Sequence, residues 1–173
     1  FRQPATIVGL CIVKRSSLAR LQTLIAIKDK ELKLMKKKLL IATHSVFADG
    51  IKNAMELVTG EQNSVSTLCA YTNDMTEVET PIKEIIDALC DDEELIVTTD
   101  IFGGSVNNEF MKYLSKSNIY LIAGVNLPLL FELIMNLESE NTVQMIENAI
   151  QNAKEQLQYC NPLIQCSITE ENF

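Results

Sequence analysis

The only histidine of the sequence, His44, directly follows the short apolar run Leu39–Thr43. Imidazole is the one side chain whose unperturbed pKa lies close to neutral pH, so a histidine at this position suits a nucleophile or a general base. On its own, a histidine is more often an ordinary polar residue or a helix cap than a catalytic group. The residues expected near His44 therefore decide how it is interpreted.

A carboxylate stands at the corresponding place after a later apolar run, because Asp100 follows Leu95–Thr99. In parallel α/β sheets the carboxyl ends of the strands share one edge, where ligands bind near the point at which the strand order reverses. We therefore expect His44 and Asp100 at the same edge. A carboxylate bonded to one ring nitrogen fixes the tautomer and leaves the other nitrogen's lone pair free. The simpler alternative is that Asp100 is an ordinary turn residue.

The turn Gly103-Gly104-Ser105 lies just after Asp100 and opens a predicted helix. Glycines let backbone N–H groups approach a ligand, and a helix N-terminus favours an anion such as phosphate. A tight turn with Ser105 as the helix cap explains the same residues without a ligand. The sequence contains neither a P-loop motif nor Gly-x-Gly-x-x-Gly after a strand, which disfavours a nucleotide site.

Apolar periodicity predicts strands and helices in alternation along the chain. The predicted strands are 39–43, 65–71, 95–99 and 119–123, and the predicted helices are 47–59, 76–90, 105–114, 128–136 and 141–157. This order predicts a three-layer α/β fold, with a mainly parallel sheet of about four strands flanked by helices. Residues 35–173 are expected to form this domain. Residues 1–34 differ in character and are interpreted as an N-terminal extension or an appended helix.

Composition narrows the classes of partner. The 173 residues carry a formal net charge of −8, which disfavours nucleic acid because binding to phosphate backbones needs clustered Lys and Arg. Five cysteines without a Cys-x-x-Cys pair indicate reduced thiols, with neither a disulfide framework nor a zinc site. Since no apolar run approaches the roughly 20 residues of a membrane-spanning helix, we expect a cytoplasmic protein without membrane insertion.

Three segments together resemble one known family, the enzyme IIA components of the mannose class of the bacterial sugar phosphotransferase system. These segments are Ile41–His44 with Ala48 and the helix ending at Thr59-Gly60-Glu61, then Thr99–Ser105 with Asn108, and finally Ile122–Pro128. They run in order over most of residues 35–157. The family often has Gly in place of Ser45 and Pro in place of Val106, but neither difference removes a reacting group. The hydroxyl of Ser45 is expected to cap the following helix.

The resemblance implies a phosphocarrier. His44 would accept a phosphoryl group from the histidine phosphocarrier protein and pass it to the IIB component of a sugar permease. Asp100 would hold the ring, and Gly103, Gly104 and Ser105 would receive the phosphoryl oxygens. Transfer between two imidazoles requires no metal or cofactor in principle. The resemblance also implies a homodimer that exchanges a C-terminal strand, for which Leu163–Ile168 is one candidate.

Three other functions remain open from the sequence. The same fold and histidine occur in the phosphotransfer subunit that serves dihydroxyacetone kinases. A regulatory module of this fold would leave His44 unphosphorylated. A small hydrolase with His44 as its base is the weakest alternative, because no nucleophile is visible. The sugar itself is not determined, since in this family the permease selects it.

Overall fold

The computed structural model describes residues 35–73 and 76–162. In this part, four parallel strands form one sheet in the order β2-β1-β3-β4. The strands are β1 (Lys36–His44), β2 (Val65–Ala70), β3 (Glu93–Thr99) and β4 (Ile119–Ala123). The predicted extension 1–34 and the candidate strand Leu163–Ile168 lie outside the described residues.

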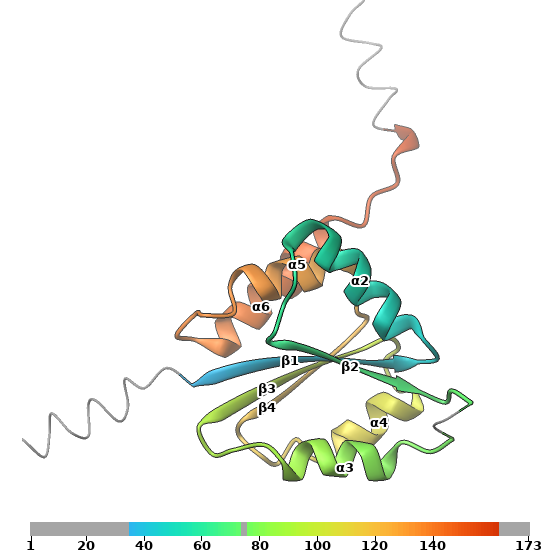
Figure 1. Cartoon of the computed structure of the whole chain (residues 1–173). Helices are drawn as coiled ribbons and strands as arrows, with labels where there is room; N and C mark the ends of the chain where they lie inside the picture. Colours follow the sequence, from blue (N-terminus) through green and yellow to red (C-terminus); the bar gives the residue numbers. More distant parts are fainter. Residues whose placement is uncertain (1–34, 74–75, 163–173) are drawn as a thin grey trace, which may run out of the picture. The chain divides into compact units, whose positions relative to one another are not determined.

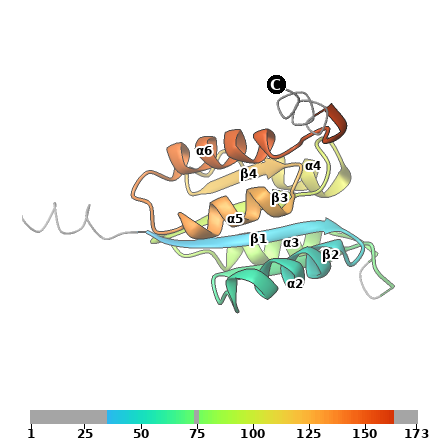
Figure 2. The same ribbon diagram turned by 90° about the horizontal axis from the view of Figure 1, so that it is seen from above.

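Helices cover both faces of the sheet (Figure 1). One layer holds α2 (Phe47–Thr59), α5 (Leu127–Met135) and α6 (Thr142–Glu155), and the other holds α3 (Glu79–Asp87) and α4 (Ser105–Met111). Seen from above in Figure 2, α2 lies on one side of β1, and α5 and α6 lie on the other. The predicted three-layer α/β fold is confirmed.

Side chains of β1 alternate between two hydrophobic cores, as successive strand residues point to opposite faces. Leu39 and Ile41 pack in the core under α2, α5 and α6, whereas Leu40 and Ala42 pack in the core over α3 and α4. All four are at most 1% exposed. Burial on both faces explains why this strand is a continuous apolar run rather than an alternating one.

The strand order places a reversal between β1 and β3. From β1 the chain passes through α2 to β2, and it then returns through α3 to β3 on the other side of β1. Two neighbouring strands whose connections leave toward opposite faces open a crevice at their carboxyl ends, which is where α/β sheets bind ligands. His44 ends one of these strands, and Asp100 follows the other.

Two local predictions were wrong. For the helix predicted over 76–90, Asp74 and Thr76 are the cap candidates in the sequence, but the helix begins only at Glu79 and its N-cap is Val78. For helix 47–59 the apolar spacing predicts that Phe47, Ile51, Ala54, Met55 and Val58 share one face. In the structure the buried residues of α2 are Ala48, Ile51 and Met55, so the buried face is rotated relative to the predicted one. Phe47 and Val58, predicted to face inward, are exposed, because the helix packs on β1 and β2 through the Ala48 side.

Candidate active site

His44 is the last residue of β1, and its side chain is 38% exposed at the carboxyl edge of the sheet. The chain turns sharply after it, since Ser45 has a left-handed φ of 54°. The backbone N–H of Ser45 donates to the carbonyl of Ala70 at 2.7 Å, which ties this turn to the end of β2. The expected cap is absent: the N-cap of α2 is Val46, which makes no side-chain cap bond.

Asp100, the first residue after β3, contacts His44 twice. Its Oδ2 accepts from the backbone N–H of His44 at 2.9 Å and lies 2.8 Å from Nδ1 of the ring. Its Oδ1 accepts from the backbone N–H of Ile101 at 2.9 Å. Because an ionised carboxylate only accepts hydrogen bonds, the ring proton is assigned to Nδ1, and Nε2 keeps a free lone pair.

The charge state of Asp100 follows from these contacts. Partial burial by itself raises the pKa of the carboxyl group. Three interactions lower the pKa and together outweigh the effect of burial: the hydrogen bonds from the backbone and ring of His44, the charge of that ring, and the hydrogen bond from the Ile101 N–H. The pKa of Asp100 therefore lies below its ordinary value. Asp100 is therefore an anion at neutral pH that can stabilise positive charge on the imidazole.

Ser105 lies on the opposite side of the ring, with its Oγ 3.1 Å from Nε2 of His44. It is the first residue of α4, whose N-cap is Gly104 without a side-chain cap bond. Ser105 is therefore not the helix cap that the simple turn interpretation requires. Its hydroxyl instead faces the nitrogen that carries the free lone pair.

The two glycines, Gly103 and Gly104, allow the turn to pack closely against the His44 ring. Gly103 has a φ of 74°, which favours glycine. A Cβ on Gly104 would lie 2.5 Å from Cγ2 of Ile101 and 3.3 Å from Cε1 of His44. The N–H of Gly103 donates to Oδ1 of Asn107 at 3.1 Å, and that of Gly104 donates to the carbonyl of Ile101 at 3.2 Å. In this state both N–H groups serve the turn itself.

Asn107 supports the Gly103 turn, and the sequence did not indicate this role. It is 2% exposed, and its Nδ2 donates to Oγ1 of Thr99 at 3.1 Å, so it links the Gly103 turn to the end of β3. Asn108 donates to the carbonyl of Gly103 at 2.8 Å. Together the two asparagines fix both backbone groups of Gly103. In the sequence, Asn107 is equally compatible with an exposed helix position, so no sequence signal indicates this role.

An aromatic side chain covers one face of the ring. Tyr71 stacks on His44 with a centroid distance of 5.6 Å and an interplanar angle of 20°. Val46 and Phe47 follow His44 in the chain, Ile101 and Phe102 follow Asp100, and these four apolar side chains are between 45% and 79% exposed. The predicted strand 65–71 includes Tyr71 but does not indicate that its ring stacks on His44.

This arrangement suits a nucleophilic imidazole. Nε2 has a free lone pair and is reachable from solvent, while Asp100 orients the ring and compensates positive charge that develops on it. Among the described residues, no group of three or more His, Cys, Asp or Glu side chains could hold a metal ion. The site therefore offers a single nucleophile, its orienting carboxylate and a hydroxyl beside the reacting nitrogen.

Comparison with known proteins identifies the family. The family described as the PTS system fructose IIA component matches residues 38–150. The chain belongs to this fructose/mannose-class IIA family of the phosphotransferase system. The match includes both His44 and Asp100.

Individual relatives agree with this assignment. The IIA-family chain is 21% identical over 124 residues to the fructose-specific EIIA component of Bacillus subtilis, covering 70% of this chain and 85% of the relative. A crystal structure of a Klebsiella pneumoniae protein of the phosphoenolpyruvate-dependent sugar phosphotransferase system is 41% identical, with a TM-score of 0.73 and coverage of 76% and 96%. The PTS IIA protein associated with the fucose utilization operon of Streptococcus pneumoniae is 34% identical, with a TM-score of 0.57 and coverage of 72% and 98%.

A helix needs sufficient length and apolar character to span a membrane. In the part of the chain that the structure describes, no helix has both the length and the apolar character needed to cross a membrane.

The strained turn after His44 makes a stability prediction. Ser45→Gly is expected to stabilise the fold by about 0.5–1 kcal/mol, because glycine relieves the left-handed strain but adds some chain entropy. Ser45→Ala is the matched control: it removes the hydroxyl but keeps the strain, so its free energy of unfolding should not rise. Urea unfolding of the three proteins measures both effects. An equal gain in both variants would show that the hydroxyl, rather than the backbone, carries the cost.

Proposed function

We propose that the domain of residues 35–173 is a phosphocarrier of the sugar phosphotransferase system, with residues 1–34 as an extension. It accepts a phosphoryl group on Nε2 of His44 from the histidine phosphocarrier protein and passes it to a IIB component for sugar uptake. The observation that carries the proposal is the 2.8 Å contact between Asp100 and Nδ1 of an exposed histidine in a chain of the IIA family. A cytoplasmic location follows from these partners.

The phosphoryl group moves from the imidazole of the donor to the imidazole of His44. The lone pair of Nε2 attacks the phosphorus of the donor phosphohistidine, a new N–P bond forms, and the donor's N–P bond breaks with its electron pair returning to the donor ring. Asp100 stabilises the positive charge that His44 gains. The Ser105 hydroxyl, 3.1 Å from Nε2, is placed to turn to a phosphoryl oxygen as that bond forms. Such transfer depends mainly on positioning and electrostatics.

The two glycines support this step mainly by their shape. Their N–H groups already bond within the turn, so in this proposal Ser105 is the main phosphoryl-binding group. Gly104 leaves room beside Cε1 of His44, and Gly103 makes the turn possible. Tyr71 and the exposed apolar side chains that follow His44 and Asp100 in the chain supply the surface on which the donor and the acceptor protein dock in turn, through a modest and transient interface.

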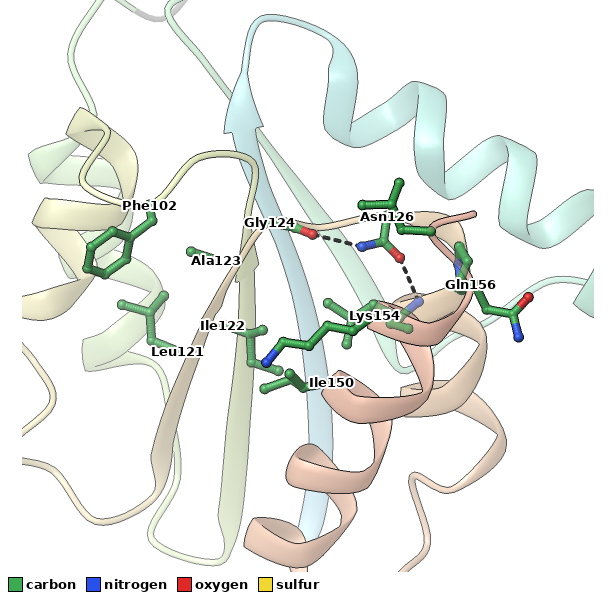
Figure 3. Close-up of a pocket in the computed structure, with 13 residues that line it drawn as sticks. Phe102, Leu121, Ile122, Ala123, Gly124, Asn126, Ile150, Lys154 and Gln156 are labelled. Carbon is green, nitrogen blue, oxygen red and sulfur yellow. Dashed lines mark hydrogen bonds between the residues drawn. The ribbon is translucent and has the colours of Figure 1, made fainter. Parts of the chain in front are cut away.

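Among the described residues no further strand pairs with the outer edge of β4, which supports a homodimer. A mostly apolar pocket of about 640 Å³ lies along this edge (Figure 3). Leu121 and Ile122 of β4, Ile150 of α6 and Phe102 line it. An unpaired strand edge beside an apolar pocket is a template for an added strand. We propose that a C-terminal segment of a second copy, as the family resemblance implies, occupies it.

Removal of residues 163–173 tests this assembly. The full chain is expected to have the mass of a dimer in light scattering, and the shortened chain the mass of a monomer. Phe102→Glu, which places a charge at an exposed position of the pocket lining, is expected to weaken the dimer in the full-length chain. A shortened chain that remains dimeric would contradict the exchange of a C-terminal strand.

The downstream partner is tested by label transfer. The chain is first labelled with phosphorylated carrier protein and then offered separately to a IIB component and to a dihydroxyacetone kinase. Transfer to the IIB component supports the proposal. Transfer to the kinase alone would assign the chain to kinase supply, and no uptake of label at all would favour a regulatory module.

A further inference from the structure

Tyr71 is placed against His44 by an unusual backbone. It directly follows β2, and its φ of 58° is left-handed, a region that bulky residues rarely adopt. Among the described residues other than glycine, only Ser45 and Tyr71 have a positive φ, and both adjoin His44. The bond from the Ser45 N–H to the carbonyl of Ala70 holds the two turns together. Strained backbone is common at functional sites, so the strain at Tyr71 beside His44 suggests a function for this residue.

The position of the Tyr71 ring defines what it can do. A centroid distance of 5.6 Å with 20° between the planes lies in the range of offset stacking, so one face of the imidazole is covered. Tyr71 is 43% exposed, so general burial does not explain its placement. In the unphosphorylated ring, Asp100 contacts Nδ1, Ser105 contacts Nε2 and Tyr71 covers the face.

Phosphorylation changes this set of contacts. A phosphoryl group on Nε2 ends the direct contact of that nitrogen with Ser105, whose hydroxyl then bonds to a phosphoryl oxygen. The bonds to Asp100 and Ser105 lie at the two ends of the phosphorylated ring and still allow it to tilt about the line between them. The stacked Tyr71 ring is then the remaining contact that fixes the plane of the imidazole. The phosphorylated ring also carries positive charge while Nδ1 keeps its proton, and the face of an aromatic ring attracts such charge.

We propose that Tyr71 is a positioning residue for phosphoryl transfer, which holds the plane of the phosphorylated His44 ring and stabilises its positive charge. This inference rests on the proposed phosphocarrier function. Tyr71 does not touch the transferred group. It acts through the ring of His44 and keeps the N–P bond aligned for the next acceptor.

Two substitutions separate the aromatic ring from the backbone and the hydroxyl. Tyr71→Phe keeps the ring and removes only the hydroxyl. Tyr71→Asn removes the ring but tolerates the left-handed backbone. At saturating phosphorylated carrier protein, the single-turnover rate of Tyr71→Asn is expected to fall about threefold to tenfold, as the loss of one stacked pair allows. Tyr71→Phe is expected to retain the wild-type rate.

An NMR measurement supplies a readout that a merely structural role would not change. With ¹³C-labelled histidine, relaxation of the His44 ring reports its motion in the free and phosphorylated states. The ring of Tyr71→Asn is expected to be more mobile than the wild-type ring, chiefly when phosphorylated, whereas that of Tyr71→Phe is not.

The outcomes distinguish this inference from the proposed function. A wild-type chain that takes up phosphate, together with a Tyr71→Asn variant of equal rate and equal ring motion, would overturn the role of Tyr71 alone. Tyr71→Phe as slow as Tyr71→Asn would overturn the stacking argument and assign the effect to the hydroxyl. A wild-type chain that takes up no phosphate would overturn the proposed function and the role of Tyr71 with it.

Discussion

His44→Gln is expected to take up no acid-labile phosphate from the phosphorylated carrier protein. Glutamine fills similar space and can still bond to Asp100, but its amide nitrogen has no lone pair available for attack on phosphorus. Loss of the nucleophile removes the covalent step altogether, so the uptake rate should fall by more than about 10⁴-fold. Rapid-quench measurement with radiolabelled carrier protein gives the rate for both proteins.

The control for this variant is its stability. His44 is a partly exposed residue at the end of β1, so its replacement should change the free energy of unfolding by no more than about 1 kcal/mol. An intact fold without uptake assigns the loss to the imidazole. Uptake by His44→Gln at the wild-type rate would place the phosphoryl group on another side chain.

Asp100→Asn is expected to lower the uptake rate by about 10²–10⁴-fold, the range seen when a carboxylate that orients a catalytic histidine is neutralised. The neutral amide no longer compensates charge on the ring, and its NH₂ group can donate to Nδ1, which would favour the wrong tautomer. Single-turnover rates measure the loss, and ¹⁵N NMR of the ring identifies the tautomer. A wild-type rate with a changed tautomer would contradict the orienting role.

The same substitution has a stability effect that depends on pH. Because the folded state lowers the pKa of Asp100 below its ordinary value of 3.8, the ionised carboxylate stabilises the fold above that value. This contribution is lost as the pH falls through the lower folded-state pKa. The difference in unfolding free energy between wild type and Asp100→Asn should therefore shrink as the pH falls below about pH 4.

Asp91→Asn is the matched control for this pH dependence. Asp91 is an exposed residue in the turn before β3, at the opposite end of that strand from Asp100. Its substitution should leave the pH dependence of unfolding close to that of the wild type. If both variants changed it equally, the effect would reflect net charge rather than the contacts of Asp100.

The sequence predicted the elements whose periodicity is strong. The bounds of α2 and β4 are as predicted, and β1 differs only in beginning at Lys36 and ending at His44. The placement of His44 and Asp100 at one edge of the sheet was also predictable, because the carboxyl ends of parallel strands share that edge. Their contact depends on β1 and β3 being neighbours, which the sequence does not indicate. In contrast, α3 begins later than predicted, because the helical sequence pattern extends beyond the residues that pack on the sheet.

The remaining features of the site depend on tertiary structure. The left-handed backbone of Ser45 and Tyr71 is imposed by the contact between two turns, and neither residue type indicates it. Asn107 could have been an exposed helix residue until the position of Thr99 was known. The stacking of Tyr71 on His44 joins the ends of β1 and β2, which local periodicity cannot place side by side in this register.

The most direct test of the account is to locate the phosphoryl group. The chain is exposed to phosphorylated carrier protein, digested under alkaline conditions, and the modified peptide is examined by mass spectrometry and ³¹P NMR. One acid-labile phosphoryl group is expected, on the peptide containing His44 and bonded to Nε2, because Asp100 occupies Nδ1. A phosphoryl group on Nδ1, or on any other residue, would contradict it.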